Sequence, residues 1–162
     1  MTTRHDPPLP DVFADCFSAF EEQLHPAGTP YHNCFGCAPN HQIGLRVRCF
    51  KAEEGVISPI IISKQFEGPP GVAHGGIVAG YLDEILAAAA VYQGGRICLT
   101  GELTVRYVRP VPLDTPLLGR GRVAQDRGKY LELGGSLEEY RSRAVLAEAR
   151  GRFFPIRLPS GP

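Results

Sequence analysis

The segment from residue 71 to residue 90, GVAHGGIVAGYLDEILAAAA, constrains the fold of this chain more than any other. Its residues are small or apolar apart from one histidine and two adjacent acids, Asp83 and Glu84. Residues 77–91 contain no proline, are rich in alanine and leucine, and are followed by a pair of glycines, which predicts a helix that stops there. A helix that is apolar on nearly every face is expected to be buried on nearly every side.

The segments around this helix carry strand patterns. In residues 44–52 apolar side chains alternate with arginines, and GVISPIIIS follows after the turn AEEG, which predicts a hairpin with an edge or a bulge at Pro59. A hairpin, one long helix and then several antiparallel strands favour the α+β class over alternating βαβ units. We expect one central helix wrapped by an antiparallel sheet, with later strands at 96–109, 116–126, 129–140 and 143–154.

The remaining N-terminal part adds a tail and a short helix. Residues 1–10 are expected to form a disordered tail, and residues 11–24 an amphipathic helix with Asp11 as its N-cap. A chain of 162 residues with 43% hydrophobic residues suits one domain, expected over residues 11–157. The apolar face expected for the short helix holds Val12, Phe13, Cys16, Phe17, Phe20 and Leu24.

Charge and cysteine content narrow the class of protein. Seventeen Lys and Arg balance seventeen Asp and Glu, which gives nucleic acid and anionic membranes no special attraction. Five cysteines, an odd number, favour reduced thiols and a cytoplasmic location. The N-terminus has no apolar core of signal-peptide length, and we expect no later apolar run to reach the ~18 residues of a membrane span.

The two acids of the central helix require an explanation, because an unpaired buried carboxylate is costly. Each must be paired, protonated or directed into a cavity. Helical spacing gives Asp83 the smaller neighbours and therefore more room than Glu84. The alternative is that either acid is a surface charge paired to an arginine. The stripe through Asp83 holds Gly76, Ala79, Gly80, Leu86, Ala87 and Ala90, and that through Glu84 holds Ile77, Gly80, Tyr81, Ala88 and Val91.

The start of the helix, His74-Gly75-Gly76, is the second chemical feature. The first N–H groups of a helix have no partners within it, and they lie at the positive end of its dipole, where a developing oxyanion can be received. The alternative is a glycine-rich turn that only lets the chain enter a crowded core. An acid that follows in a buried helix favours the functional interpretation.

Four stretches in order resemble one known family. HGGIVAGYLDE, CFGCAPNHQIGL, FEGPPGVAHGG and TGELTVRYVRPVPL are similar to segments of hot dog fold acyl-CoA thioesterases of the phenylacetate-pathway (PaaI-like) and 4-hydroxybenzoyl-CoA thioesterase superfamily. The resemblance extends roughly from Cys34 to Phe154. It implies a hot dog fold, to which the short helix expected at residues 11–24 is an addition, and an enzyme that hydrolyses acyl-CoA thioesters without a cofactor.

The resemblance also implies catalytic roles. Asp83 would act as general base or as nucleophile, and the backbone N–H of Gly75 would polarise the thioester carbonyl. His74 would orient the glycine turn, and Thr100 matches a strand Ser or Thr that positions the attacking water in several relatives. The alternative for Thr100 is an ordinary strand threonine. Some relatives carry an asparagine where this chain has Gly68, so the mechanism must work without that amide.

Four further residues are expected to contact the substrate. Gly76 follows the oxyanion donor, and Tyr81 could line a pocket for an aromatic or a medium-chain acyl group. Arg106 and Arg109 are placed to meet the coenzyme A phosphates, with solvated surface arginines as the alternative. A carrier-protein thioester fits the same pattern.

The loop HNCFGCAPNH offers four potential zinc ligands, His32, Cys34, Cys37 and His41. A zinc knuckle would indicate a protein that binds nucleic acid or a partner. Four ligands within ten residues would form a very tight loop, and the neutral charge gives no support. We therefore expect no metal site, and a loop that helps to shape the substrate channel.

Spacing along the helix predicts the assembly. Gly75 and Asp83 are eight residues apart, so their Cα atoms lie roughly 12 Å apart, whereas both must reach about 3 Å from the reacting thioester. Two antiparallel helices across a two-fold axis would bring Gly75 of one subunit to Asp83 of the other. We expect a homodimer or homotetramer with shared active sites. A non-catalytic acyl-CoA binding or sensing protein is the alternative function, and a hot dog dehydratase or hydratase is a weaker one.

Overall fold

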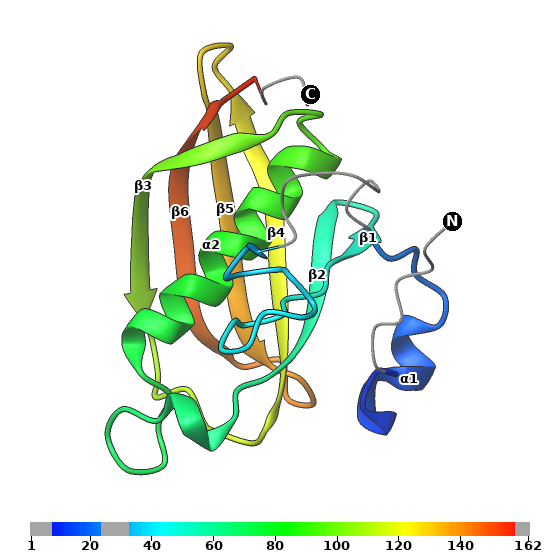
Figure 1. Ribbon diagram of the computed structural model, residues 1–162, viewed down its shortest axis with the longest axis vertical. Helices are drawn as coiled ribbons and strands as arrows, with labels where there is room; N and C mark the ends of the chain where they lie inside the picture. Colours follow the sequence, from blue (N-terminus) through cyan, green and yellow to red (C-terminus); the bar gives the residue numbers. More distant parts are fainter. Residues whose placement is uncertain (1–7, 24–32, 158–162) are drawn as a thin grey trace.

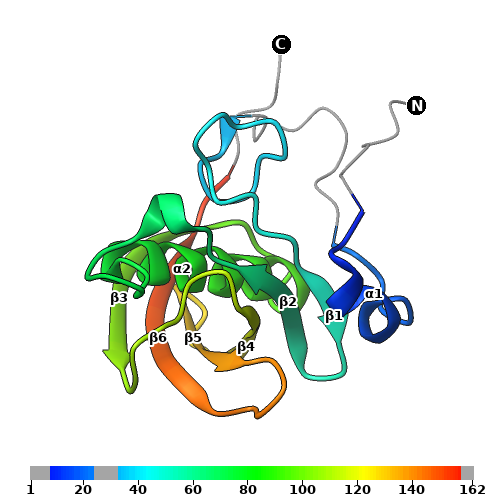
Figure 2. The same ribbon diagram turned by 90° about the horizontal axis from the view of Figure 1, so that it is seen from below.

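An antiparallel sheet curled around one long helix forms the body of the computed structural model, which describes residues 8–23 and 33–157 (Figures 1 and 2). The six strands follow the order β1-β2-β4-β5-β6-β3, so β1 and β3 are the edges. This arrangement confirms the α+β hot dog fold. The strands are β1 (Phe50–Ala52), β2 (Gly55–Ile61), β3 (Cys98–Tyr107), β4 (Pro116–Asp126), β5 (Leu131–Glu139) and β6 (Val145–Pro155), and the helices are α1 (Asp11–Phe17), the short 3-10 helix η2 (Lys64–Phe66) and α2 (Gly75–Tyr92).

The central helix α2 buries one face in the concave side of the sheet. Glycines in β4 allow the close approach: a Cβ at Gly119 would lie 2.3 Å from Cδ1 of Ile85, and one at Gly121 would lie 2.9 Å from the Ile85 carbonyl oxygen. The expectation of burial on nearly every side was wrong, because the sheet covers only one face. The opposite face, which includes Ala79, Gly80, Asp83 and Ala87, is partly exposed. The buried residues of α2 are Val78, Tyr81, Leu82, Ile85, Leu86, Ala89 and Ala90.

By length and composition alone, α2 would be able to cross a membrane. The expectation that no apolar run is long enough was therefore wrong. Helix α2 contacts strands β2 to β6. A core helix packed against a sheet can pass the same test of length and composition as a membrane span.

Helix α1 is shorter than predicted. It ends at Phe17 instead of residue 24, because the chain then turns to form a bridge between Glu22 and Phe50 of β1. Pro10, not Asp11, is the N-cap residue, and Asp11 lies in the first turn. Phe13 and Phe17 pack into a second cluster with Phe50, Ile57 and Leu118. Cys16 and Phe20 are exposed, contrary to prediction, and Leu24 and residues 1–7 lie outside the described residues.

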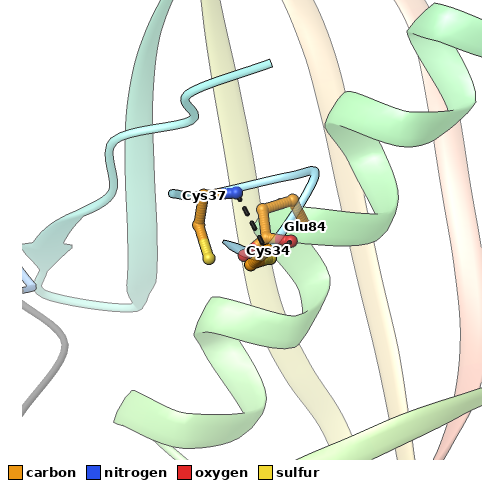
Figure 3. A group of neighbouring side chains, drawn as sticks. All are labelled: Cys34, Cys37 and Glu84. Carbon is orange, nitrogen blue, oxygen red and sulfur yellow. Dashed lines mark hydrogen bonds between the residues drawn. The ribbon is translucent and has the colours of Figure 1, made fainter. Parts of the chain in front are cut away.

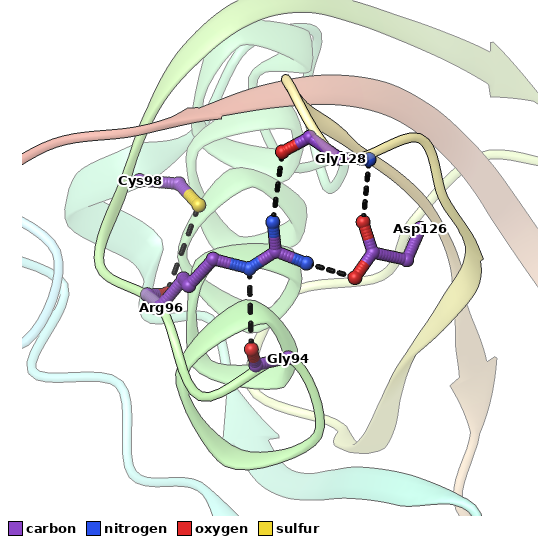
Figure 4. A network of polar contacts seen from close by, with 5 residues as sticks. All are labelled: Gly94, Arg96, Cys98, Asp126 and Gly128. Carbon is purple, nitrogen blue, oxygen red and sulfur yellow. Dashed lines mark hydrogen bonds and ion pairs between the residues drawn. The ribbon is translucent and has the colours of Figure 1, made fainter.

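Helix α2 and strands β3 to β6 lie within two residues of the predicted ranges at each end, whereas the first hairpin strand is much shorter than predicted. The first hairpin strand begins only at Phe50, and Pro59 of β2 lies beyond the last residue that β1 pairs with, so its missing N–H costs no bond to β1. Helix α2 ends at Tyr92, just before the glycine pair that was predicted to stop it. Close to this end, Arg96 connects the helix to the turn between β4 and β5. Its guanidinium donates a hydrogen bond of 3.0 Å to the carbonyl of Gly128 and forms an ion pair with Asp126 (Figure 4).

Candidate active site

Asp83 is the acid of α2 that faces the sheet edge at β3. Its Oδ1 accepts a hydrogen bond of 2.6 Å from Oγ1 of Thr100, the third residue of β3. Asp83 itself is partly buried, and no ion pair joins it to a lysine or arginine within residues 8–23 and 33–157. The arrangement excludes a surface charge paired to an arginine in the described part of the chain, and it brings together two residues that the sequence predicted to act together.

Glu84 points in a different direction from its neighbour. Its Oε2 lies 3.9 Å from Sγ of Cys34, in the loop that crosses α2, and Cys37 lies beside them (Figure 3). Burial, the largest cause, raises the pKa of the Glu84 carboxyl above its usual range. The contrast supports Asp83 over Glu84 as the acid available to a substrate at β3.

The start of α2 leaves one N–H group available. His74 is the N-cap residue, and its Nδ1 accepts a hydrogen bond of 3.0 Å from the N–H of Gly76. The carbonyl of His74 accepts from Ile77 and Val78. Among the described residues no acceptor pairs with the N–H of Gly75, so that group is the free donor at the positive end of the helix. The exposed Gly76 has its own N–H engaged by His74.

Tyr107, at the far end of β3, was not predicted as a site residue. Its hydroxyl donates a hydrogen bond of 2.6 Å to the carbonyl of Gly75. Its side chain is 50% exposed and lies against the helix start. No sequence signal joins two residues 32 positions apart, although a tyrosine often carries one apolar and one hydrogen-bonded end.

The predicted substrate-contact residues are spread more widely. Tyr81 is 5% exposed and belongs to the main core, and burial raises its pKa to about 12. Arg106 pairs with Glu148 at 3.1 Å, whereas the side chain of Arg109 is exposed beyond the end of β3. Gly68 packs tightly on the helix start, since a Cβ there would lie 3.0 Å from the Cα of His74. A larger residue at position 68 would displace the turn at the start of the helix. The substrate contacts of Tyr81, Arg106 and Arg109 remain predictions.

The described residues do not bring together the four zinc ligands considered from the sequence. His41 Nδ1 accepts a hydrogen bond from the N–H of Ile43 in its own loop. His32 lies outside the described residues. Cys34 and Cys37 instead converge on Glu84, a residue that the local spacing of the loop could not indicate.

Comparison with known proteins finds one family that matches the central part of the chain. The family model for the thioesterase superfamily matches residues 70–138, which contain all of α2 and β3. Within these residues the chain is similar to the thioesterase superfamily. It is similar to the acyl-coenzyme A thioesterase THEM4 of Xenopus laevis, with 29% identity over 65% of this chain and 47% of that protein. The chain therefore spans about half the length of this curated relative.

Solved structures of the thioesterase superfamily share the fold. The superfamily protein RHA08564 aligns with a TM-score of 0.69 and 27% identity, over 76% of this chain and 60% of that one. The PaaI protein of E. coli, from the phenylacetic acid degradation operon, aligns with a TM-score of 0.61 and 18% identity, over 68% of this chain and 83% of that one. These findings confirm the resemblance to the PaaI-like thioesterases.

Proposed function

We propose that this chain hydrolyses acyl-CoA thioesters to the free acid and coenzyme A. One observation carries the proposal: the helix that the thioesterase family model matches presents, at Gly75, an N–H with no partner among the described residues and, further along, the carboxylate of Asp83 held by Thr100. Thioester hydrolysis needs a group that activates or replaces water and a donor for the oxyanion. The name of the THEM4 relative supports acyl-CoA as the substrate class.

The complete site requires two subunits. Within one chain the Cα atoms of Gly75 and Asp83 are about 12 Å apart along α2, too far for both groups to reach one thioester carbon. A two-fold axis that sets two α2 helices antiparallel would pair Gly75 of each with Asp83 of the other. Two features support this assembly: the face of α2 that carries Asp83 is partly exposed, and β3 is an edge strand with β6 on one side only. Tetramers could form by further pairing of sheets.

The chemistry then has two routes. In the first, Asp83 takes a proton from water as the water oxygen attacks the thioester carbon, and the oxyanion accepts a hydrogen bond from the Gly75 N–H. The C–S bond then breaks, and the proton passes from Asp83 to the leaving thiolate. In the second, the Asp83 carboxylate attacks the carbon, the C–S bond breaks, and the coenzyme A thiolate leaves and takes a proton from solvent. Water then hydrolyses the resulting anhydride, which releases the free acid and returns the Asp83 carboxylate. A general base contributes ~10²–10⁴ in rate and an oxyanion donor ~10²–10³.

Three further residues position these groups. Thr100 holds Oδ1 of Asp83, which leaves Oδ2 for water or substrate. Tyr107 holds the carbonyl of Gly75, and His74 holds the N–H of Gly76. Both contacts fix the same peptide unit, the one between Gly75 and Gly76. The preceding unit, which carries the Gly75 N–H, is held by the His74 carbonyl, which accepts hydrogen bonds from Ile77 and Val78. A donor that is already oriented needs no reorganisation when charge develops.

The test is thiol release from a panel of aromatic and medium-chain acyl-CoA thioesters by the full chain. Asp83→Asn should lower kcat at least about 100-fold, within the range of a lost general base. Asp15→Asn is the matched control, since Asp15 is an exposed aspartate on α1 and should stay close to wild type. Full activity of Asp83→Asn would overturn the assignment of the base. Tight binding of these thioesters without cleavage by the wild type would favour the alternative, a non-catalytic acyl-CoA binding protein.

A further inference from the structure

Outside the predicted active site, a second cluster of reactive side chains joins the N-terminal loop to α2. It consists of Cys34, Cys37 and Glu84, which we name the Cys-Cys-Glu cluster (Figure 3). Its two sulfur atoms and one carboxylate oxygen all lie within 4.8 Å of one another. Cys37 is buried, whereas Cys34 and Glu84 are partly buried, so one side of the cluster is open to solvent.

The loop is shaped for this convergence. The N–H of Cys37 points at Sγ of Cys34 at 3.4 Å, and the N–H of Ala38 donates to the Cys34 carbonyl at 3.0 Å, which closes a tight turn. Gly36 lies between the cysteines, and a Cβ there would fall 2.1 Å from Oε2 of Glu84. Only glycine at position 36 lets the carboxylate approach the turn so closely.

The atoms present fit one class of cation. Two sulfurs and one carboxylate oxygen suit zinc, whereas Mg²⁺ and Ca²⁺ select oxygen ligands alone. Tetrahedral zinc with ordinary Zn–S and Zn–O distances separates a sulfur from an oxygen by about 3.6 Å. Cys34 Sγ and Glu84 Oε2 are 3.9 Å apart, so these two atoms would need to approach by only a few tenths of an ångström. No arginine or lysine forms an ion pair with Glu84 in the described part of the chain.

We propose that Cys34, Cys37 and Glu84 bind one zinc ion, with the fourth position open to water. The ion would connect the loop that contains the two cysteines to α2, at Glu84, the residue that follows Asp83. Zinc binding would release the protons of the two thiols and give the Glu84 carboxylate a positively charged partner. The donor set differs from the four loop residues considered from the sequence, because the third ligand comes from the helix.

Cobalt(II) substitution tests the site directly, since thiolate ligands give cobalt a charge-transfer band in the ultraviolet. The full chain is reduced, stripped with a chelator and titrated with Co²⁺, and the bound cobalt is then displaced with Zn²⁺. We expect about one ion per chain and a thiolate band that zinc abolishes. The band should vanish in Cys34→Ser and Cys37→Ser, and Glu84→Gln should weaken binding at least about tenfold, in the range of a lost metal-site partner.

Cys16→Ser is the matched control, because Cys16 is an exposed cysteine on α1, away from the cluster. Its band should equal that of the wild type. Zinc should also protect Cys34 and Cys37 from alkylation in the wild type, a readout that needs no folded variant. No thiolate band in the reduced wild type, or a band that survives loss of Cys34 or requires Cys16, would overturn the proposal. These readouts involve no thioester, so the metal site and the proposed hydrolysis can fail separately.

Discussion

Thr100 on β3 donates a hydrogen bond of 2.6 Å to Asp83 on α2, which joins two residues 17 positions apart in the chain. The contact holds one oxygen of the only α2 carboxylate that faces this strand. A hydrogen bond to a charged group is worth about 1.5–3 kcal/mol. Its loss would be felt in the step that uses Asp83.

Thr100→Val should therefore lower kcat about 10- to 100-fold with little change in KM, since it removes the hydroxyl and keeps the branched shape. Thr100→Ser should recover most of the loss. Steady-state kinetics with a good acyl-CoA substrate separate the two constants. An equal effect of the valine and serine variants, or a change in KM alone, would show that Thr100 is an ordinary strand residue.

Arg109 is the better of the two predicted phosphate contacts, because Arg106 already pairs with Glu148. Arg109→Ala should raise KM for acyl-CoA about 2- to 5-fold, the effect of one exposed charge pair. The matched measurement uses an acyl-pantetheine, which lacks the nucleotide and its phosphates, and whose KM should not change. A parallel rise for both substrates would place Arg109 outside the phosphate site.

The close packing of α2 on β4 is testable by a pair of substitutions. Gly119→Ala should destabilise the fold by about 1–3 kcal/mol, because its Cβ would lie 2.3 Å from Cδ1 of Ile85. Ile85→Val removes that Cδ1 at a cost of about 0.5–1.5 kcal/mol. The double variant should be more stable than the sum of the two losses predicts. Urea denaturation of the four proteins measures the coupling, and additive losses would contradict the contact.

Tyr81 should make stability depend on pH in alkaline solution. Burial raises its pKa to about 12, from 10.0, so between these values the folded chain holds a proton that the unfolded chain has lost. The contribution of Tyr81 to the free energy of unfolding is fully present below pH 10 and is lost as the pH rises toward 12. The total loss is about 2–3 kcal/mol. Tyr81→Phe should show a smaller loss than the wild type over this window. Identical profiles in denaturant titrations would contradict the burial of a neutral hydroxyl.

The sequence predicted elements whose pattern is local and missed features that depend on distant contacts. Helix α2 and strands β3 to β6 were placed within three residues at each end, because alternation and helical spacing follow from which faces are buried. Helix α1 was too long, since the bridge from Glu22 to Phe50 redirects the chain. The same helix spacing that gave Asp83 room identified the acid that meets Thr100.

The missed site features all join remote segments. Tyr107 reaches the carbonyl of Gly75 from the far end of β3, and only the packing of β3 beside α2 brings them together. Glu84 meets Cys34 from 50 positions away, so a search for ligands within the loop could not find it. Site residues that are brought together by such long-range contacts can be identified only from the folded arrangement of the sheet and the loop.

The shared active site is tested most directly by combining two inactive subunits. Gly75→Pro deletes the proposed oxyanion donor at a helix position that tolerates proline, after a residue, His74, whose ψ of 133° already suits one. Asp83→Asn deletes the base. Each variant carries a different affinity tag, the two are expressed together, and the mixed dimer is purified through both tags.

A mixed dimer whose sites combine Gly75 of one subunit with Asp83 of the other contains one intact site and one doubly defective site. We predict about half of the wild-type kcat per dimer, while either variant alone shows almost none. If each site were built within a single chain, every site of the mixed dimer would carry one defect. A mixed dimer as inactive as its parents would contradict the account.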